Sequence, residues 1–191
     1  MGRLLDADDS VLVVIDTQEG FLRKLPAVEG SELVDRIRWL CRLAMWLGVP
    51  VVVTEEAPER NGPTAQSIRD VLAPGTSRHS KPVFDLSACP PILEEVARRG
   101  RGTVVLCGLE TDVCVAQSAL GLLERGKRAV VVEDAVASPG TAHAQGLARM
   151  ARAGVELVGV KGLGYDWLRT VERSTAFDAA TGGEAPAGIV L

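Results

Sequence analysis

Residues 103–126 read TVVLCGLETDVCVAQSALGLLERG, and this stretch decides the fold. It begins with the continuous apolar run Thr103–Cys107, which is typical of a buried strand, and passes through a turn at Gly108. A helix is then expected from about Cys114 to Arg125, with glycine directly after it as a stop signal. A buried strand that leads directly into a helix is half of a βαβ unit, so the stretch predicts a parallel sheet covered by helices.

The same alternation extends over most of the chain. Four further short apolar runs predict buried strands: Val11–Ile15, Val51–Thr54, Ala129–Val132 and Val155–Val160. Helices are predicted over residues 31–47, from Pro90 through Arg99, and from a cap at Thr141 to just before Gly154. Strands that alternate with helices in this way predict an α/β fold, a doubly wound (Rossmann-like), mostly parallel sheet with helices on both faces.

Two polar segments rich in proline and glycine interrupt the alternation. Glu55–Pro63 and Ala73–Pro82 are predicted to be loops near strand ends, where ligands bind in open α/β sheets. We expect a single domain over residues 1–177. From Asp178 the chain is rich in Gly, Ala and Pro, and residues 178–191 are predicted to form a loosely packed tail.

Composition excludes several classes of protein. Hydrophobic residues make up 47% of the chain and mean hydropathy is +0.16, which is enough apolar material for a core and excludes a disordered protein. The 21 basic and 25 acidic residues give a net charge of −4, so we expect no nucleic-acid or membrane partner. The first ten residues resemble no signal peptide, and no apolar run approaches the roughly 20 residues that span a bilayer. We therefore expect a cytoplasmic protein.

The cysteines do not form a recognisable framework. Four are present, at positions 41, 89, 107 and 114, with no C-x-x-C pair and only two histidines in the chain. This pattern argues against both a disulfide scaffold and a zinc site made of Cys and His.

Three residues are candidates for chemistry because each follows a strand or lies between loops. Cys114 lies at the start of a predicted helix, where the helix dipole lowers a thiol pKa; the alternative is a small cysteine packed under the helix. Asp16 ends the first strand and either caps a turn or acts as a base, and Lys81 is either solvated or part of the same site. A doubly wound sheet would bring all three to one edge.

Several short motifs follow one another along residues 8–160. They are Asp16-x-Gln18-x-x-Phe21, Gly62-Pro63-Thr64, Lys81, Gly108-x-x-Thr111-Asp112-x-Cys114-Val115 and Asp134-Ala135…Ser138. In these motifs the chain resembles the isochorismatase-like superfamily of cysteine hydrolases, and it is most similar to the branch of isochorismatase domain-containing proteins.

The resemblance implies a six-stranded parallel sheet and a catalytic triad of Asp16, Lys81 and Cys114. It also implies a cis peptide between Leu109 and Glu110, and an oxyanion hole formed by the amides of Glu110 and Cys114. We expect two groups of residues around the triad: the nucleophile loop, Leu109, Glu110 and Val113, and the substrate pocket, Gln18, Phe21, Glu55 and Phe84.

Two features of the sequence narrow the chemistry that the family allows. Residues 54–59 read TEEAPE, without the histidines of the metal motif in related nicotinamidases, so we expect no metal and no other cofactor. Members that cleave the vinyl ether of isochorismate usually lack the cysteine, whereas this chain keeps Cys114. The sequence therefore predicts a hydrolase that cleaves a small-molecule amide or related acyl substrate through a thioester. The alternatives are a low-turnover binding or scaffold protein, an isochorismate-type hydrolase, and a redox-sensing thiol.

The predicted helix over residues 31–47 carries two apolar stripes. Leu33, Ile37, Leu40, Ala44 and Leu47 form the stripe that would pack on the sheet. Trp39, Leu43 and Trp46 form the second stripe, which either a neighbouring helix or a partner chain would cover. Because family members are commonly dimers or larger assemblies, we expect a homo-oligomer with this helix as one possible contact.

Overall fold

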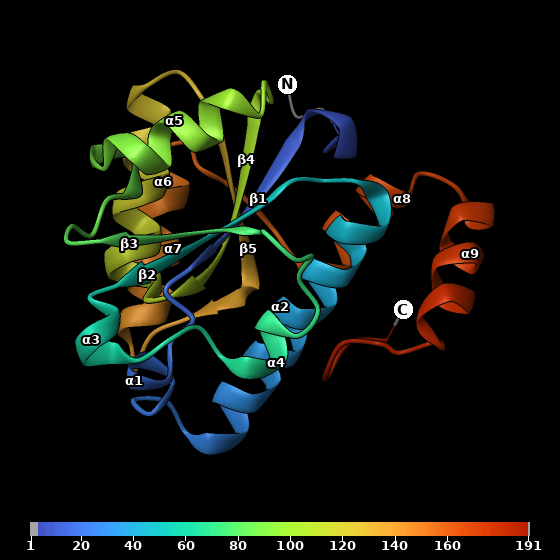
Figure 1. Ribbon diagram of the computed structural model, residues 1–191, viewed down its shortest axis with the longest axis horizontal. Coiled ribbons are helices and arrows are strands. Elements are labelled where there is room, and N and C mark those ends of the chain that lie inside the picture. Colours follow the sequence, from blue (N-terminus) through green and yellow to red (C-terminus); the bar gives the residue numbers. More distant parts are fainter. Residues whose placement is uncertain (1–3, 191) are drawn as a thin grey trace.

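The computed structural model describes residues 4–190 (Figure 1). Its centre is one six-stranded sheet in which all neighbours are parallel, in the order β3-β2-β1-β4-β5-β6. The strands are β1 (Ser10–Ile15), β2 (Val51–Glu56), β3 (Ser77–Lys81), β4 (Thr103–Leu109), β5 (Arg128–Ala137) and β6 (Glu156–Val158). The predicted doubly wound sheet is therefore confirmed.

Helices cover both faces of this sheet (Figure 1). The helices are α1 (Glu19–Leu22), α2 (Ala27–Leu47), α3 (Pro58–Asn61), α4 (Gln66–Arg69), α5 (Pro90–Arg98), α6 (Ala116–Glu124), α7 (Ala142–Arg152), α8 (Val160–Leu168) and α9 (Val171–Thr181). Three short turns complete the elements: η1 (Ala7–Asp9), η2 (Leu86–Ala88) and the π-helical turn η3 (Thr111–Val115). The large helix α2 packs on one face together with α8, and α9 lies outside these two helices, whereas α5, α6 and α7 cover the other face.

Burial on both faces explains the continuous apolar runs. Every residue of β1 is buried. Leu12 and Val14 belong to the core under α2, and Val13 and Ile15 belong to the core under α6. A strand that packs against helices on both sides has no polar face, so it shows no alternation of apolar and polar residues.

The predicted loop Ala73–Pro82 was wrong, because it contains β3. The sequence of β3, SRHSK, has no apolar run. It lies at the edge of the sheet, and His79 and neighbouring positions are only partly covered. The last predicted strand was too long: β6 ends at Val158, and α8 begins at Val160, whose N–H donates to Asp134 Oδ1 at 2.7 Å.

The prediction of a loosely packed tail was also wrong. Helix α9 continues to Thr181, and the residues after it lie along α2. Trp39 Nε1 donates to the carbonyl of Glu184 at 3.0 Å, and Arg36 Nε donates to the carbonyl of Ala187 at 2.9 Å. The segment after residue 177 is therefore attached to the body of the domain by hydrogen bonds to α2.

The second apolar stripe of α2 is covered within one chain. The Phe177 ring of α9 packs edge-on against Trp39 and Trp46, with centroid separations of 5.5 and 5.6 Å. Trp39 is only 4% exposed and Trp46 is 39% exposed. Gly164 of α8 leaves room for the Trp39 ring, because a Cβ there would lie 2.9 Å from it. This stripe therefore gives no support to the expected homo-oligomer, which stays a prediction.

The Phe177 side chain is expected to stabilise the folded domain through its packing between α2 and α9. Phe177→Ala should lower the free energy of unfolding by about 3–5 kcal/mol, the usual cost of removing a buried phenylalanine ring. Val171→Ala, on the exposed start of the same helix, is the matched control and should change it little. Denaturant unfolding followed by tryptophan fluorescence measures both. Equal, small effects would contradict the packing of α9 on α2.

Candidate active site

The candidate site lies at the centre of the sheet, between β1 and β4. The chain continues from β1 to β2 and β3 on one side, and then crosses to β4, β5 and β6 on the other. Ligands bind at such a switch point, outside the carboxyl ends of the strands. Asp16 directly follows β1, and η3, which contains Cys114, follows β4. The topology thus brings the predicted acid and thiol to the same edge.

Gly108 allows β4 to approach β1 closely at this edge. Its φ is +119°, and a Cβ at this position would lie 1.9 Å from the carbonyl oxygen of Ile15, so no other residue fits. The next peptide bond, between Leu109 and Glu110, is cis, as the resemblance implied. The carbonyl of Glu110 then accepts from the N–H groups of Val113 and Val115 at 3.2 and 3.1 Å. These bonds shape the turn that presents Cys114.

The nucleophile loop is also held from outside. Asp112 Oδ1 accepts a 2.6 Å hydrogen bond from Ser138 Oγ, just beyond β5. Thr111 Oγ1 and His143 Nδ1, on α7, share a hydrogen bond of 3.0 Å. Gly146 of α7 lies so close that a Cβ there would be 2.8 Å from the Asp112 Cα. The loop is therefore fixed by β5 and α7 as well as by its own turn.

Asp16 and Lys81 form a buried ion pair. Lys81 Nζ lies 2.6 Å from Asp16 Oδ2, and both side chains are 0% exposed. Thr54 Oγ1 donates to Asp16 Oδ1 at 2.8 Å. The ammonium also donates to the carbonyls of Val83 and Phe84, at 3.0 and 3.3 Å. The buried ammonium is thus held by one ion pair and two hydrogen bonds, as a charge removed from water requires.

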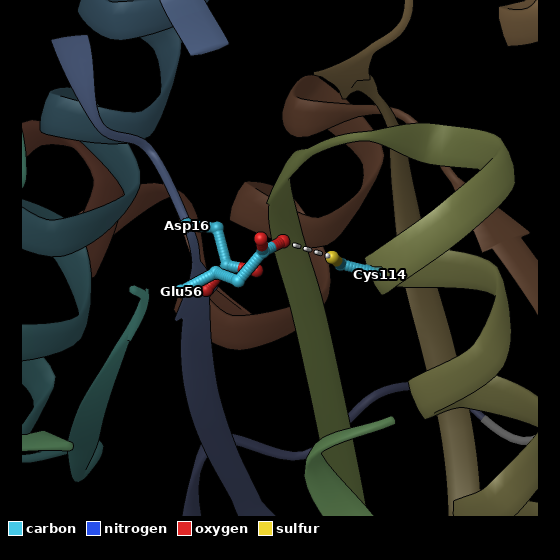
Figure 2. Close-up of side chains that lie close together, drawn as sticks. All are labelled: Asp16, Glu56 and Cys114. Carbon is cyan, nitrogen blue, oxygen red and sulfur yellow. Dashed lines mark hydrogen bonds between the residues drawn. The ribbon is translucent and has the colours of Figure 1, made fainter. Parts of the chain in front are cut away.

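Cys114 lies beside this pair. Its side chain is 2% exposed, and Sγ donates to Glu56 Oε2 over 3.6 Å. The Cys114 sulfur and one carboxylate oxygen each from Asp16 and Glu56 lie within 4.8 Å of one another, and Figure 2 shows the three side chains pointing toward one another. The structure therefore brings the predicted Asp16, Lys81 and Cys114 together and adds Glu56.

The expected lowering of the Cys114 pKa by the helix N-terminus was wrong. Burial raises the pKa of the Cys114 thiol well above its ordinary range, and the negative charge of Asp16 raises it further. The ammonium of Lys81 opposes this shift but does not cancel it. The free site therefore holds a neutral thiol next to a carboxylate that can accept its proton.

Glu56 is the site residue that the sequence reasoning missed. The second strand was expected to end at Thr54, but β2 continues to Glu56. Side chains alternate along a strand, so Glu56 shares a face with Thr54 whereas Glu55 points the other way. The carboxylate of Glu55 accepts from the N–H and hydroxyl of Thr64, at 2.9 and 2.8 Å. If the predicted strand had been extended by two residues beyond Thr54, the alternation of its side chains would have selected Glu56, and not Glu55, as the site residue.

Gln18 supports the site through the backbone of its neighbours. Its side chain accepts from the N–H of Glu56 at 2.7 Å and donates to the carbonyls of Glu56 and Gly62, at 3.1 and 2.6 Å. It thereby ties the segment after β1 to the segment after β2.

The two phenylalanines predicted to line the pocket lie in different surroundings. Phe21 belongs to the core under α2 and is 6% exposed, with Lys24 Nζ 4.5 Å above its ring. Phe84 is 49% exposed and contacts Lys81 through its carbonyl. Lys24 also pairs with the Glu110 carboxylate of the nucleophile loop at 3.0 Å. A pocket-lining role for Phe21 and Phe84 stays a prediction.

Asp16, Glu56 and Cys114 are also the type of side chains that bind metal ions. However, the ammonium of Lys81 lies 2.6 Å from Asp16 Oδ2 and already balances its charge. A divalent cation on the same carboxylate would be repelled by that ammonium. This geometry favours the lysine as the cation of the site, and metal independence stays a prediction.

Comparison with known proteins supports the family resemblance seen in the sequence. The Isochorismatase domain matches residues 10–161. The chain belongs to the isochorismatase family of hydrolases. Isochorismatase domain-containing protein 2 of Bos taurus is 37% identical over 139 residues, which cover 72% of this chain. The match spans 64% of the bovine protein, just under two thirds of its length.

Several solved structures share the fold of this chain. YcaC from Pseudomonas aeruginosa, determined with hexane-2,5-diol and covalent acrylamide, has a TM-score of 0.89 and 25% identity, covering 98% of this chain and 94% of that one. Escherichia coli YcaC, described as an octameric hydrolase of unknown specificity, has a TM-score of 0.86 and 24% identity, covering 92% and 87%. MAR1 ribonuclease from Caenorhabditis elegans has a TM-score of 0.84 and 28% identity, covering 98% and 97%. Across residues 4–190 of our chain, no helix is both long and apolar enough to cross a membrane.

The effects of substituting Asp16 and Lys81 on the free energy of unfolding are expected to be coupled, because the two side chains form a buried ion pair. Lys81→Met leaves the Asp16 carboxylate buried without a counter-ion, so it should cost about 3–5 kcal/mol of stability. The double variant Asp16→Asn/Lys81→Met should lose clearly less than the sum of the two single variants, because it removes both charges. Denaturant unfolding of all four proteins closes the cycle. Additive losses would show that the two groups do not interact.

Thiol reactivity should follow the access of a reagent to each sulfur. In a Cys89→Ser background, which removes the only partly exposed cysteine among the described residues, iodoacetamide should modify Cys114 before Cys41 and Cys107. Both of those thiols are 0% exposed within the core on the α2 face, whereas Cys114 is 2% exposed and lies at the edge of the sheet where ligands bind. The Cys114 rate should rise about tenfold per pH unit from pH 7 to 9, because only the thiolate reacts. Peptide mapping gives the order; a rate that is flat with pH would mean a thiolate at rest.

Proposed function

We propose that the protein is a metal-independent cysteine hydrolase of a small amide or related acyl compound. The observation that carries the proposal is the Asp16 carboxylate, held between Lys81 and Thr54 and within reach of the Cys114 sulfur. A carboxylate with fixed orientation beside a thiol is the arrangement that nucleophilic catalysis by cysteine needs.

The proposed reaction has two halves. Asp16 takes the thiol proton as Cys114 Sγ attacks the substrate carbonyl, and then gives it to the leaving amine as the C–N bond breaks. Water next attacks the thioester, and Asp16 accepts a proton from the water. The bond between carbon and sulfur then breaks, the carboxylic acid is released, and Asp16 returns the proton to Cys114 Sγ. The raised pKa of the Cys114 thiol suits this scheme, because the proton leaves the sulfur only as the new bond forms.

Lys81 acts on the same steps without touching the thiol in the free site. Its ammonium keeps the Asp16 carboxylate in place, and its positive charge stabilises the thiolate as it develops. By resemblance, the amides of Glu110 and Cys114 would hold the oxyanion, with Leu109 and Val113 completing the nucleophile loop.

The relatives support a small-molecule substrate and an assembly. The covalent acrylamide in P. aeruginosa YcaC is itself a small amide bound to that protein. The octameric state of E. coli YcaC supports the expected homo-oligomer. The C. elegans relative is described as a ribonuclease, but the net charge of −4 here and the two carboxylates at the sulfur disfavour a polyanion.

A panel of small primary amides tests the proposal. Cys114→Ser should abolish turnover of any amide that the wild-type protein hydrolyses, and Asp16→Asn should lower kcat about 10²–10⁴-fold, the usual contribution of a general base. Cys89→Ser is the matched control and should keep the wild-type rate, and so should wild-type protein treated with a chelator. Turnover that survives in Cys114→Ser would refute the thioester route, and binding without turnover of any amide would favour the scaffold alternative.

A further inference from the structure

The carboxylate of Glu56 faces the nucleophile without a counter-ion. Among residues 4–190, no Lys, Arg or His forms an ion pair with it, and its one side-chain contact is the Cys114 sulfur at 3.6 Å. Asp16, the other carboxylate at the sulfur, is neutralised by Lys81, and Glu110 on the nucleophile loop is paired with Lys24. With the Cys114 thiol neutral, Glu56 leaves the reaction centre with a net negative charge.

The position of Glu56 is fixed by its backbone. Its N–H and carbonyl are both bonded to the Gln18 side chain, and its carbonyl accepts a further 2.9 Å bond from Asn61 Nδ2. Figure 2 shows its carboxylate directed at the Cys114 sulfur from the side of the sheet that carries Asp16. The residue is half-buried, so a molecule that reaches the sulfur replaces part of the water around this carboxylate.

A partly desolvated carboxylate without a counter-ion favours cationic ligands and ligands with N–H donors. A cation or an N–H donor stabilises its charge, whereas an anion at the same distance destabilises it. We propose that Glu56 is a specificity-determining residue, which selects substrates with a protonated amine or donor N–H beside the scissile carbonyl and rejects anionic acyl compounds. This inference rests on the proposed function and deepens it. It also disfavours the isochorismate-type alternative, because that substrate is an anion.

The reactivity of Cys114 tests this selection without any turnover. Two methanethiosulfonate reagents, one with a 2-(trimethylammonium)ethyl group and one with a 2-sulfonatoethyl group, convert the thiolate to a mixed disulfide and release methanesulfinate. The ratio of the cationic to the anionic rate is measured in a Cys89→Ser background and divided by the same ratio for glutathione. Any change in the Cys114 pKa alters both rates equally and cancels in the ratio.

The wild-type ratio should favour the cationic reagent, and Glu56→Gln should lower this ratio at least about tenfold, which corresponds to roughly 1.4 kcal/mol. Glu59→Gln, on the exposed helix α3, removes the same charge three residues away and should leave the ratio nearly unchanged. Circular dichroism and unfolding curves confirm that the variants are folded. A ratio unchanged by Glu56→Gln would overturn the inference.

Three amides of similar size test the same selection in turnover. Glycinamide is cationic, propanamide neutral and malonamate anionic. The wild-type protein should prefer them in that order in kcat/KM, and Glu56→Gln should reduce the ratio of the glycinamide value to the malonamate value. Loss of all turnover in folded Glu56→Gln would instead make Glu56 the catalytic base and overturn the inference. If the wild-type protein hydrolyses no amide, the proposed function fails, and the reagent ratio still decides the role of Glu56.

Discussion

The buried pair of Asp16 and Lys81 is the interaction on which the site depends. Two fully buried charges are stable only when they are paired and hydrogen-bonded, and here the carboxylate pairs with Lys81 and accepts from Thr54 while the ammonium also donates to the carbonyls of Val83 and Phe84. These contacts join the ends of β1, β2 and β3. The same pair that holds the strand ends together therefore fixes the carboxylate and the positive charge that the proposed reaction uses beside the thiol.

The two carboxylates next to Cys114 differ in their partners and so in their proposed tasks. Asp16 is neutralised and fully buried, which suits proton transfer in a dry site. Glu56 has no described counter-ion and is partly open to solvent, which suits recognition of a charged or N–H-bearing group. Both raise the pKa of the Cys114 thiol, so the positive end of a helix does not decide its protonation state; burial and neighbouring charges do.

How much the sequence could predict depended on burial. The central strands pack between two layers of helices, so their continuous apolar runs located β1, β2 and β4 within about two residues. The run Ala129–Val132 located only the first part of β5, which continues to Ala137. The edge strand β3 has one partner strand and a partly exposed face, so it lacks that signal. Sequence position alone also marked Cys114 and Asp16 as candidates, because each follows a central strand.

Other features depend on contacts that no local pattern contains. Lys81 is a lone lysine between two predicted loops, and its sequence position left open whether it is solvated or part of the site. Glu56 was missed because the second strand was predicted to end at Thr54, whereas β2 continues through two glutamates. The packing of the residues after Asp178 rests on hydrogen bonds to Trp39 and Arg36 of α2, far away in sequence, so their Gly- and Pro-rich composition misled the prediction.

The most direct measurement for the central claim is a search for an acyl group on Cys114. A substrate amide found in the panel would be mixed with the enzyme, quenched in acid within one turnover, and the protein analysed by intact mass and peptide mapping. We predict an added mass equal to the acyl group, located on the Cys114 peptide and released by hydroxylamine. Steady turnover with Cys114 unmodified, or an acyl group on another residue, would contradict it.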